Sequence, residues 1–229
     1  MRDNRQKIKQ QIVWTAITLG IVLLLLLCIF SVVGCSSDDE EEMPPYNTVL
    51  AEVMTDNAGR AVKLRFDDGQ ERTITNEMTN LTPDSLYRVV SRIIDNAADH
   101  TVTIYGLKSV LAPMPKDYEP GKQYRDAVDV ITTWRTPRYI NLRLGVHRSE
   151  EKIHYLGFKD NGYISYESGK RTKVYELMHG QNGDGDSYVE EVIASCPVYQ
   201  LADELREGQD SVRMIITTYG KKVEYTTLY

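Results

Sequence analysis

The chain has 229 residues, of which 27 are Lys or Arg and 33 are Asp or Glu, so its formal net charge at pH 7 is −6. An acidic chain is a poor partner for nucleic acid, because binding to phosphates needs a basic surface. The length suits one large domain or two small ones in addition to a targeting segment.

Residues 1–34 have the layout of a bacterial export signal. Four bases near the start precede a stretch without charge from Ile12 to Gly34. A transmembrane helix is the alternative, since ~20 apolar residues can span a bilayer. The densest apolar part, Leu19 to Phe30, fits the roughly 7 to 15 residues of a signal peptide core. The small residues at its end favour a cleaved signal.

That end, Val32-Val33-Gly34-Cys35, resembles a bacterial lipobox. In a lipobox the cysteine thiol receives a diacylglycerol and the peptide bond before it is cut. A small residue precedes the cysteine because the peptidase site is narrow. The sequence therefore predicts cleavage between Gly34 and Cys35 and lipidation of Cys35. The mature chain would keep 23 basic and 32 acidic residues, a net charge of −9.

Residues 35–45 form a predicted lipidated tether. Its run of five acids repels itself and its two prolines add stiffness, so we expect an extended, solvated segment. Serines and acids directly after the lipidated cysteine resemble the surface-export signal of Bacteroidota lipoproteins, and a plain charged spacer is the alternative. The residues of this predicted signal are Ser36, Ser37, Asp38, Asp39, Glu40, Glu41 and Glu42. We therefore expect an outer-membrane lipoprotein that faces the cell exterior.

Residues 46–116 contain short segments of strand character. In 61–66, apolar Val62, Leu64 and Phe66 alternate with basic residues, which is the period of a half-buried strand. Gly69 follows two aspartates and suits a hairpin turn. The expected strands are 48–55, 61–66, 70–75, 86–94 and 101–111. Five strands in so short a stretch predict a small barrel of the OB type.

A proline-rich stretch separates this region from a second one, 124–229. Its clearest strand, 140–146, has apolar side chains at every second position. The expected strands are 128–134, 140–146, 153–159, 173–179, 188–194, 211–219 and 222–228. Seven strands at this spacing predict an immunoglobulin-like β-sandwich, with Trp134 buried in it. A helix is expected only at 198–206, where Val198, Leu201 and Leu205 share one face.

The combination of lipobox, acidic tether, five-strand barrel and terminal sandwich resembles the NigD-like lipoproteins. The likeness is strongest in the second half, in Asp126-Ala-Val-Asp-Val130, in Trp134 followed by Arg138-Tyr-Ile-Asn-Leu142, and in the ending from Ile215-Ile-Thr-Thr-Tyr219 to Tyr229. The resemblance implies an N-terminal OB domain and a C-terminal β-sandwich. It implies no activity and no catalytic residues.

Candidate chemistry is sparse. The histidines are His100, His147, His154 and His179, without a His-Glu-x-x-His pattern or a nucleophile motif. His147 and His154 could meet and bind a metal, but two exposed strand histidines are the favoured interpretation. The stretch 182–190 resembles a calcium loop, yet Ser187 and Ile193 occupy positions that need Gly and Glu, so we expect a hairpin loop. Cys196 is expected to be a buried core residue. The sequence predicts no metal and no cofactor.

These observations favour a non-catalytic binding or interaction module on a lipid anchor. The alternatives are a bacteriocin-associated accessory or immunity protein, by analogy, and an envelope hydrolase that uses an acidic pair. A glycan or an envelope protein is the expected ligand. Exposed tyrosines could stack on sugars or on a protein, so Tyr163, Tyr166 and the Asn182–Asp186 loop are the expected contact surface.

Overall fold

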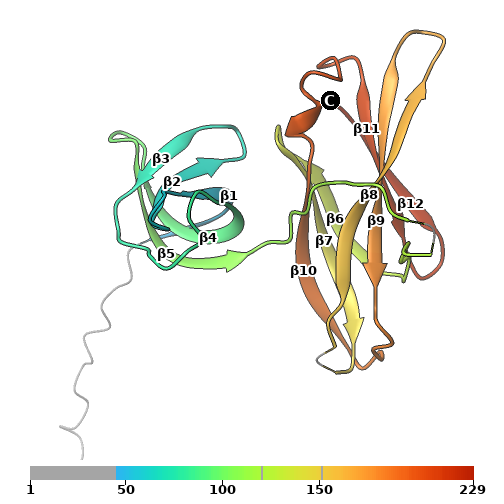
Figure 1. Ribbon diagram of the computed structural model, residues 1–229, viewed down its shortest axis with the longest axis horizontal. Helices are drawn as coiled ribbons and strands as arrows, with labels where there is room; N and C mark the ends of the chain where they lie inside the picture. Colours follow the sequence, from blue (N-terminus) through green and yellow to red (C-terminus); the bar gives the residue numbers. More distant parts are fainter. Residues whose placement is uncertain (1–44, 120, 151) are drawn as a thin grey trace, which may run out of the picture. The chain divides into compact units, whose positions relative to one another are not determined.

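The structure is a computed structural model that describes residues 45–119, 121–150 and 152–229 (Figure 1). The predicted signal, the lipidation site Cys35 and the acidic tether up to residue 44 lie outside the described residues. In the part of the chain that is described, no helix has both the length and the apolar character needed to cross a membrane.

The described chain consists almost entirely of strands. They are β1 (Asn47–Thr55), β2 (Ala61–Phe66), β3 (Glu71–Ile74), β4 (Leu86–Asn96), β5 (Thr101–Ser109), β6 (Asp129–Arg135), β7 (Tyr139–Arg148), β8 (Tyr155–Ser165), β9 (Arg171–Gly180), β10 (Tyr188–Pro197), β11 (Ser211–Thr217) and β12 (Lys222–Leu228). A short 3-10 helix, η1 (Tyr199–Leu201), lies between β10 and β11. The all-β prediction is confirmed.

Strands β1 to β5 close into a barrel in the order β1-β2-β3-β5-β4. Each neighbouring pair is antiparallel except β3 and β5, which run parallel. Alternate side chains point inward, as the period-2 pattern predicts, and they form a core around Leu64, Ile93 and Val102. Gly69 has a φ of +89° in the β2–β3 turn, a conformation that is open to glycine. The predicted OB-like barrel is confirmed.

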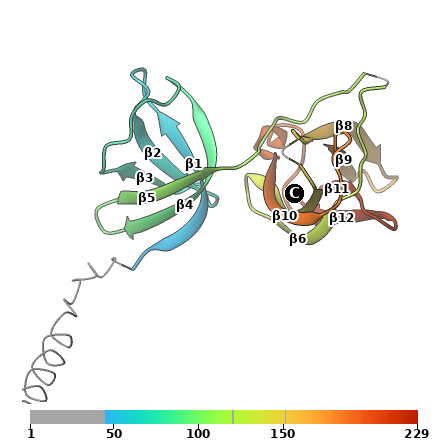
Figure 2. The same cartoon turned by 90° about the horizontal axis from the view of Figure 1, so that it is seen from below.

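The remaining strands form a three-stranded sheet, β10-β7-β6, and a four-stranded sheet, β12-β11-β9-β8. Figure 2 views these strands nearly end-on. The two sheets face each other across one core that includes Leu142, Phe158, Tyr175, Met214 and Cys196, which confirms the sandwich. Cys196 is fully buried, and burial raises the pKa of its thiol.

The segment between β5 and β6 packs on the sandwich. Leu111 pairs with Ala194 of β10, Lys116 pairs with Lys159 of β8, and Arg125 pairs with His179 of β9. A sandwich domain that begins at residue 124, as the sequence predicts, would omit the first two of these pairings.

The expected helix at 198–206 is wrong apart from its first turn, although Val198, Leu201 and Leu205 are buried as its apolar face. At the end of this stretch the buried carboxylate of Asp210 accepts the backbone N–H of Arg206 at 2.9 Å. That N–H group is then unavailable to a helical carbonyl, so the chain continues as turns.

Trp134 is half-buried rather than buried, which corrects a second expectation. It lies on β6, the edge strand of the three-stranded sheet, and this strand has no fully buried residue. An edge strand has only one neighbour, so it covers its side chains less completely than an inner strand does.

Residues 45–229 form one compact unit, and buried polar groups connect the barrel to the sandwich. Glu52 of β1 is 1 % exposed. Its carboxylate accepts hydrogen bonds from the hydroxyl of Tyr139 at 2.5 Å, from Arg138 at 3.0 Å and from Arg65 at 3.2 Å. The first two donors belong to the sandwich, so two elements far apart in the sequence satisfy one buried charge.

Candidate functional site

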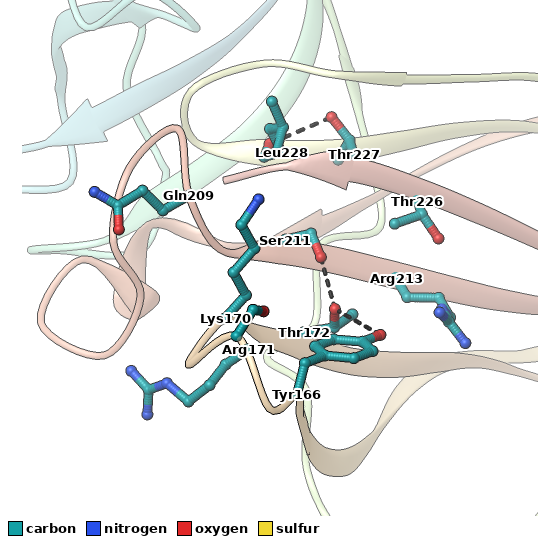
Figure 3. A pocket seen from close by; sticks show the side chains of 11 residues that line it. Tyr166, Lys170, Arg171, Thr172, Gln209, Ser211, Arg213, Thr226, Thr227 and Leu228 are labelled. Carbon is teal, nitrogen blue, oxygen red and sulfur yellow. Dashed lines mark hydrogen bonds between the residues drawn. The ribbon is translucent and has the colours of Figure 1, made fainter.

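A pocket of 490 Å³ lies on the four-stranded sheet where the β8–β9 turn meets β11 and β12 (Figure 3). Eleven residues line it: Tyr166, Ser168, Lys170, Arg171, Thr172, Gln209, Ser211, Arg213, Thr226, Thr227 and Leu228. Three of them are basic and none is acidic. This composition differs from that of the whole chain, which has a net charge of −6.

Strand pairing brings the floor of the pocket together. Ser211 of β11 is in register with Thr172 of β9 in a parallel pair. Thr172 is 2 % exposed, and its hydroxyl lies 2.7 Å from that of Ser211 and accepts or donates there. The hydroxyl of Thr172 also lies 3.3 Å from that of Tyr166. Three hydroxyl groups therefore form a connected row (Figure 3).

Basic side chains stand on the two sides of this row. Figure 3 shows Lys170 rising between Gln209 and Ser211, with Arg213 on the opposite side. Lys170 is exposed and forms no ion pair among the described residues. Arg213 shares its charge with Glu224 of β12, at 3.2 Å. The pocket thus contains one ammonium group without an ion-pair partner among the described residues, that of Lys170, and one guanidinium whose charge is partly neutralised, that of Arg213.

The side chain of Arg171 turns away from the hydroxyl row (Figure 3). Its guanidinium lies 5.4 Å from the centre of the Tyr163 ring and also donates to the backbone oxygen of Glu204. Tyr163 donates its own hydroxyl to the Glu204 carboxylate. Burial and this hydrogen bond raise the pKa of Tyr163. Arg171 and Tyr163 thereby hold the rim of the pocket in place.

The expected contact surface is therefore only partly in this pocket. Tyr166 lines it, whereas Tyr163 and the loop from Asn182 to Asp186 do not. The sequence analysis missed Lys170, Ser211 and Arg213. Alternation along β11 could have placed Ser211 and Arg213 on the outward face, but pairing of β9 with β11 joins strands that are not consecutive and has no local signal.

The Asn182–Asp186 loop connects β9 of the four-stranded sheet to β10 of the three-stranded sheet. It is a connection between sheets, so the expected hairpin loop is wrong. The Asp184 side chain has no exposed surface. Its carboxylate accepts hydrogen bonds from the backbone N–H groups of Ser149, Glu150 and Gly185, and it also bonds to a ring nitrogen of His154. Burial opposes ionisation, but these hydrogen bonds hold the pKa of Asp184 below its usual range. The aspartate that a calcium loop would use thus serves to tie two loops together.

His147 and His154 are not exposed strand residues, which corrects that expectation. The His154 side chain is 6 % exposed, and its Nδ1 lies 3.1 Å from Nε2 of His179. His179 Nδ1 lies 3.1 Å from the carbonyl of Asp126, to which it donates. His179 Nε2 is then left to accept from His154. Burial lowers the pKa of His179.

His147 belongs to a separate cluster. Its two ring nitrogens lie 2.8 Å from a carboxylate oxygen of Asp129 and 2.5 Å from one of Asp186. The hydrogen bonds with Asp129 and Asp186 raise the pKa of His147. His147 and His154 have different partners, and the described residues contain no group of three or more His, Cys, Asp or Glu side chains that could hold a metal.

Fold and site together define an all-β protein with an OB-like barrel, a β-sandwich and a polar, basic pocket on the sandwich. The profile of the NigD-like C-terminal beta sandwich domain matches residues 113–229. The chain belongs to this NigD-like family. No curated protein matches the chain.

Several solved structures are similar to the chain. A NigD-like immunity protein from Bacteroides caccae is 24 % identical with a TM-score of 0.62, over 81 % of this chain and 98 % of that one. A protein from Parabacteroides distasonis described as toxin-related is 15 % identical with a TM-score of 0.63, over 81 % and 93 %. A protein from Bacteroides fragilis described as a lipoprotein is 9 % identical with a TM-score of 0.59, over 81 % and 98 %. These likenesses establish the shared fold.

Proposed function

We propose that this protein is a lipid-anchored envelope protein that binds a ligand without transforming it, through the pocket beside Tyr166. The observation that carries the proposal is the pocket itself, an open, hydroxyl-rich surface in which one lysine has no ion-pair partner among the described residues. Polar groups that converge on a concave surface are characteristic of binding sites.

The roles of the buried ionisable groups support binding over catalysis. Asp184 holds two loops together, Asp210 fixes the turns after η1, and Glu176 accepts from Arg125 at 2.8 Å. Burial opposes ionisation of Glu176, but hydrogen bonds from Arg125, Lys222 and Asn161 lower its pKa to about 2. A general acid near neutral pH needs a raised pKa, so a hydrolase that uses these carboxylates is disfavoured.

Binding is tested on the mature protein in a nonionic detergent. Immobilised protein should retain a component of envelope extract, and Tyr166→Ala should reduce that retention. Tyr105→Ala, which removes an exposed tyrosine of the barrel, is the matched control. Equal retention by the parent and by Tyr166→Ala would place binding elsewhere. Turnover of an envelope substrate that disappears on changing a single Asp or Glu would contradict a non-catalytic role.

The anchor is proposed from the lipobox at Gly34-Cys35, and the outer face of the outer membrane from the run Ser36 to Glu42. Cys35→Ala should abolish incorporation of radiolabelled palmitate and leave the signal uncleaved. Replacement of Asp38 to Glu42 by alanines should preserve the label but protect the protein from protease added to whole cells. Equal digestion of this variant and the parent would reduce the acidic run to a spacer.

An accessory role in bacteriocin immunity is the second candidate. The observation that favours it is the fold shared with the Bacteroides caccae immunity protein and the toxin-related Parabacteroides distasonis protein. Deletion of the gene should then increase the sensitivity of the cell to a bacteriocin of a neighbouring strain. Unchanged sensitivity across a panel of producer strains would remove this candidate.

A further inference from the structure

We propose that the pocket beside Tyr166 recognises a saccharide that carries a carboxylate or sulfate group. The inference rests on the proposed binding function and names its ligand class. It follows from three properties of the same pocket: its charge, its row of hydroxyl groups and its exposed aromatic ring.

The positive charge of the pocket favours an anionic ligand. Lys170, Arg171 and Arg213 line the pocket without any acid among the lining residues. Arg213 pairs with Glu224 at 3.2 Å, and the Asp210 carboxylate accepts the backbone N–H of Arg171 at 2.7 Å. Neither acid lines the pocket, nor does Glu167 of the same turn. An ammonium group without a partner gains most from an anionic ligand, because a charge-assisted hydrogen bond is about twice as strong as a neutral one.

The row of protein hydroxyl groups favours a polar ligand that itself has several hydroxyl groups. The hydroxyls of Tyr166, Thr172 and Ser211 can each donate and accept, and they already bond to one another at 3.3 Å and 2.7 Å. Thr172 is buried, so the hydroxyls of Tyr166 and Ser211 at the two ends of the row are the ones that can exchange hydrogen bonds with hydroxyls of a sugar. A simple inorganic anion would use the lysine and leave most of the row without a partner.

The aromatic ring of Tyr166 completes the site. Tyr166 is 44 % exposed, and its own hydroxyl takes part in the row, which fixes the ring at the edge of the pocket. Leu228 is 59 % exposed on the opposite lining strand. An apolar face of this size beside hydroxyl groups suits the less polar face of a sugar ring, because tyrosine combines an apolar body with a polar tip.

A second pocket of the sandwich provides a natural contrast. It has 320 Å³ and is lined by Tyr118, Tyr124 and Tyr155 with two lysines, Lys116 and Lys122. Two acids, Asp117 and Glu119, also line it, and Glu119 pairs with Lys122 at 2.9 Å. This pocket has aromatic rings and cations but no excess of positive charge, so the same reasoning assigns it no anionic ligand.

The test titrates the mature protein in detergent with three tetrasaccharides by isothermal calorimetry. They are galacturonic acid tetrasaccharide, its fully methyl-esterified form, and a carrageenan tetrasaccharide, which carries sulfate groups and no carboxylate. The esterified form has the same sugar rings without the charge. We expect at least one acidic form to bind, the ester to bind about tenfold more weakly, and binding to weaken as salt is added. Carboxylate and sulfate recognition are told apart by which acidic form binds.

Variants then locate the site. Lys170→Ala should weaken binding about tenfold, and Tyr166→Ala about three- to tenfold. Lys122→Ala, which removes a lysine from the contrasting pocket, should leave binding unchanged. Lys170→Arg keeps the charge and should retain most of the affinity, which separates loss of charge from loss of folding.

Three results would overturn the inference. Equal affinity for the acid and its methyl ester, or equal effects of Lys170→Ala and Lys122→Ala, would remove anion recognition by this pocket. Retention of an envelope protein without binding of any of the three saccharides would also overturn it, yet the proposed binding function would stand. The absence of any retained component, together with no binding of the three saccharides, would contradict both.

Discussion

The barrel and the sandwich treat their buried charges differently. In the sandwich, the buried carboxylates of Asp184, Asp210 and Glu176 find their partners within the same domain. In the barrel, Glu52 takes two of its three donors from Arg138 and Tyr139 of the sandwich. The sandwich therefore satisfies these buried charges with its own side chains and backbone, whereas the barrel needs donors from the sandwich. The difference matters because a buried charge is stable only where its hydrogen bonds are complete.

Arg88 extends this difference. Its guanidinium pairs with Asp67 in the barrel and also donates to Asn141 at 3.1 Å and Ser195 at 3.2 Å in the sandwich. It lies over the Tyr139 ring, 4.0 Å from the ring centre. The barrel therefore depends on the sandwich at two buried charged residues, and the following predictions test that dependence.

Separating the domains should have the largest effect. A fragment of residues 110–229 should melt cooperatively and keep a β-type circular dichroism spectrum, because its core and its buried acids are complete. The barrel fragment 46–109 should not melt cooperatively, since Glu52 and Arg88 lose partners and a chain of this size has a small core. A barrel fragment as stable as the intact protein would disprove the dependence.

A fragment of residues 124–229, which starts at the boundary expected from the sequence, provides a graded control. It lacks Leu111 and Lys116, which pair with Ala194 and Lys159. Its melting temperature should be lower than that of the 110–229 fragment. Identical melting temperatures would show that the connecting segment adds no stability.

Arg138→Ala should have the next largest effect, a loss of about 3 kcal/mol, because it leaves the buried Glu52 carboxylate short of a partner. Arg143→Ala is the matched control, since Arg143 and Glu191 are 46 % and 48 % exposed and pair on the surface. An exposed pair contributes about 0 to 1 kcal/mol. Urea denaturation measures the free energy of unfolding of both variants. Equal losses of stability would contradict the importance of the buried Glu52 carboxylate.

Asp210→Asn should cost about 1 to 3 kcal/mol at pH 7, because its carboxylate accepts from Arg206 and from the backbone of Arg171. The hydrogen bonds from Arg206 lower the pKa of Asp210. The ionised form therefore contributes stability above the unfolded-state pKa of about 3.9, and this contribution is lost as the pH falls below it. The difference in free energy of unfolding between parent and variant, measured in urea, should become smaller towards pH 2. A difference that does not change with pH would contradict a stabilising role of the ionised Asp210.

His147→Asn should have the smallest effect, at most about 1 kcal/mol, since Asp129 and Asp186 are 51 % and 68 % exposed. The pKa of His147 is raised, so its contribution is complete below about pH 6.5 and is lost as the pH rises through the folded-state value. The destabilisation should therefore be larger at pH 5.5 than at pH 9. The opposite trend would mean that the imidazole is neutral between the two carboxylates.

Each of the twelve expected strand ranges overlaps an observed strand. The β2 range, for example, agrees at both ends. Alternation predicts strands with one buried face, whereas β9 is buried on both faces and shows no such period. The apolar period at 198–206 predicted burial correctly but not the helix, because three apolar residues with this spacing can also be buried by successive turns. The bond from Arg206 N–H to Asp210, four residues further on, is an interaction that periodicity does not consider. The pocket was missed because Lys170, Ser211 and Arg213 meet only through sheet pairing that is distant in sequence.

The distance in sequence between Glu52 and its partners has a consequence for biogenesis. Arg138 and Tyr139 follow Glu52 by 86 and 87 residues. A chain that emerges from a ribosome or a translocation channel with its N-terminus first exposes the barrel strands before these partners arrive. During this interval the Glu52 carboxylate lacks two of its donors. Partly folded chains with unpaired strand edges are prone to aggregation. We expect chaperone dependence to be greatest while the barrel has emerged and the sandwich has not.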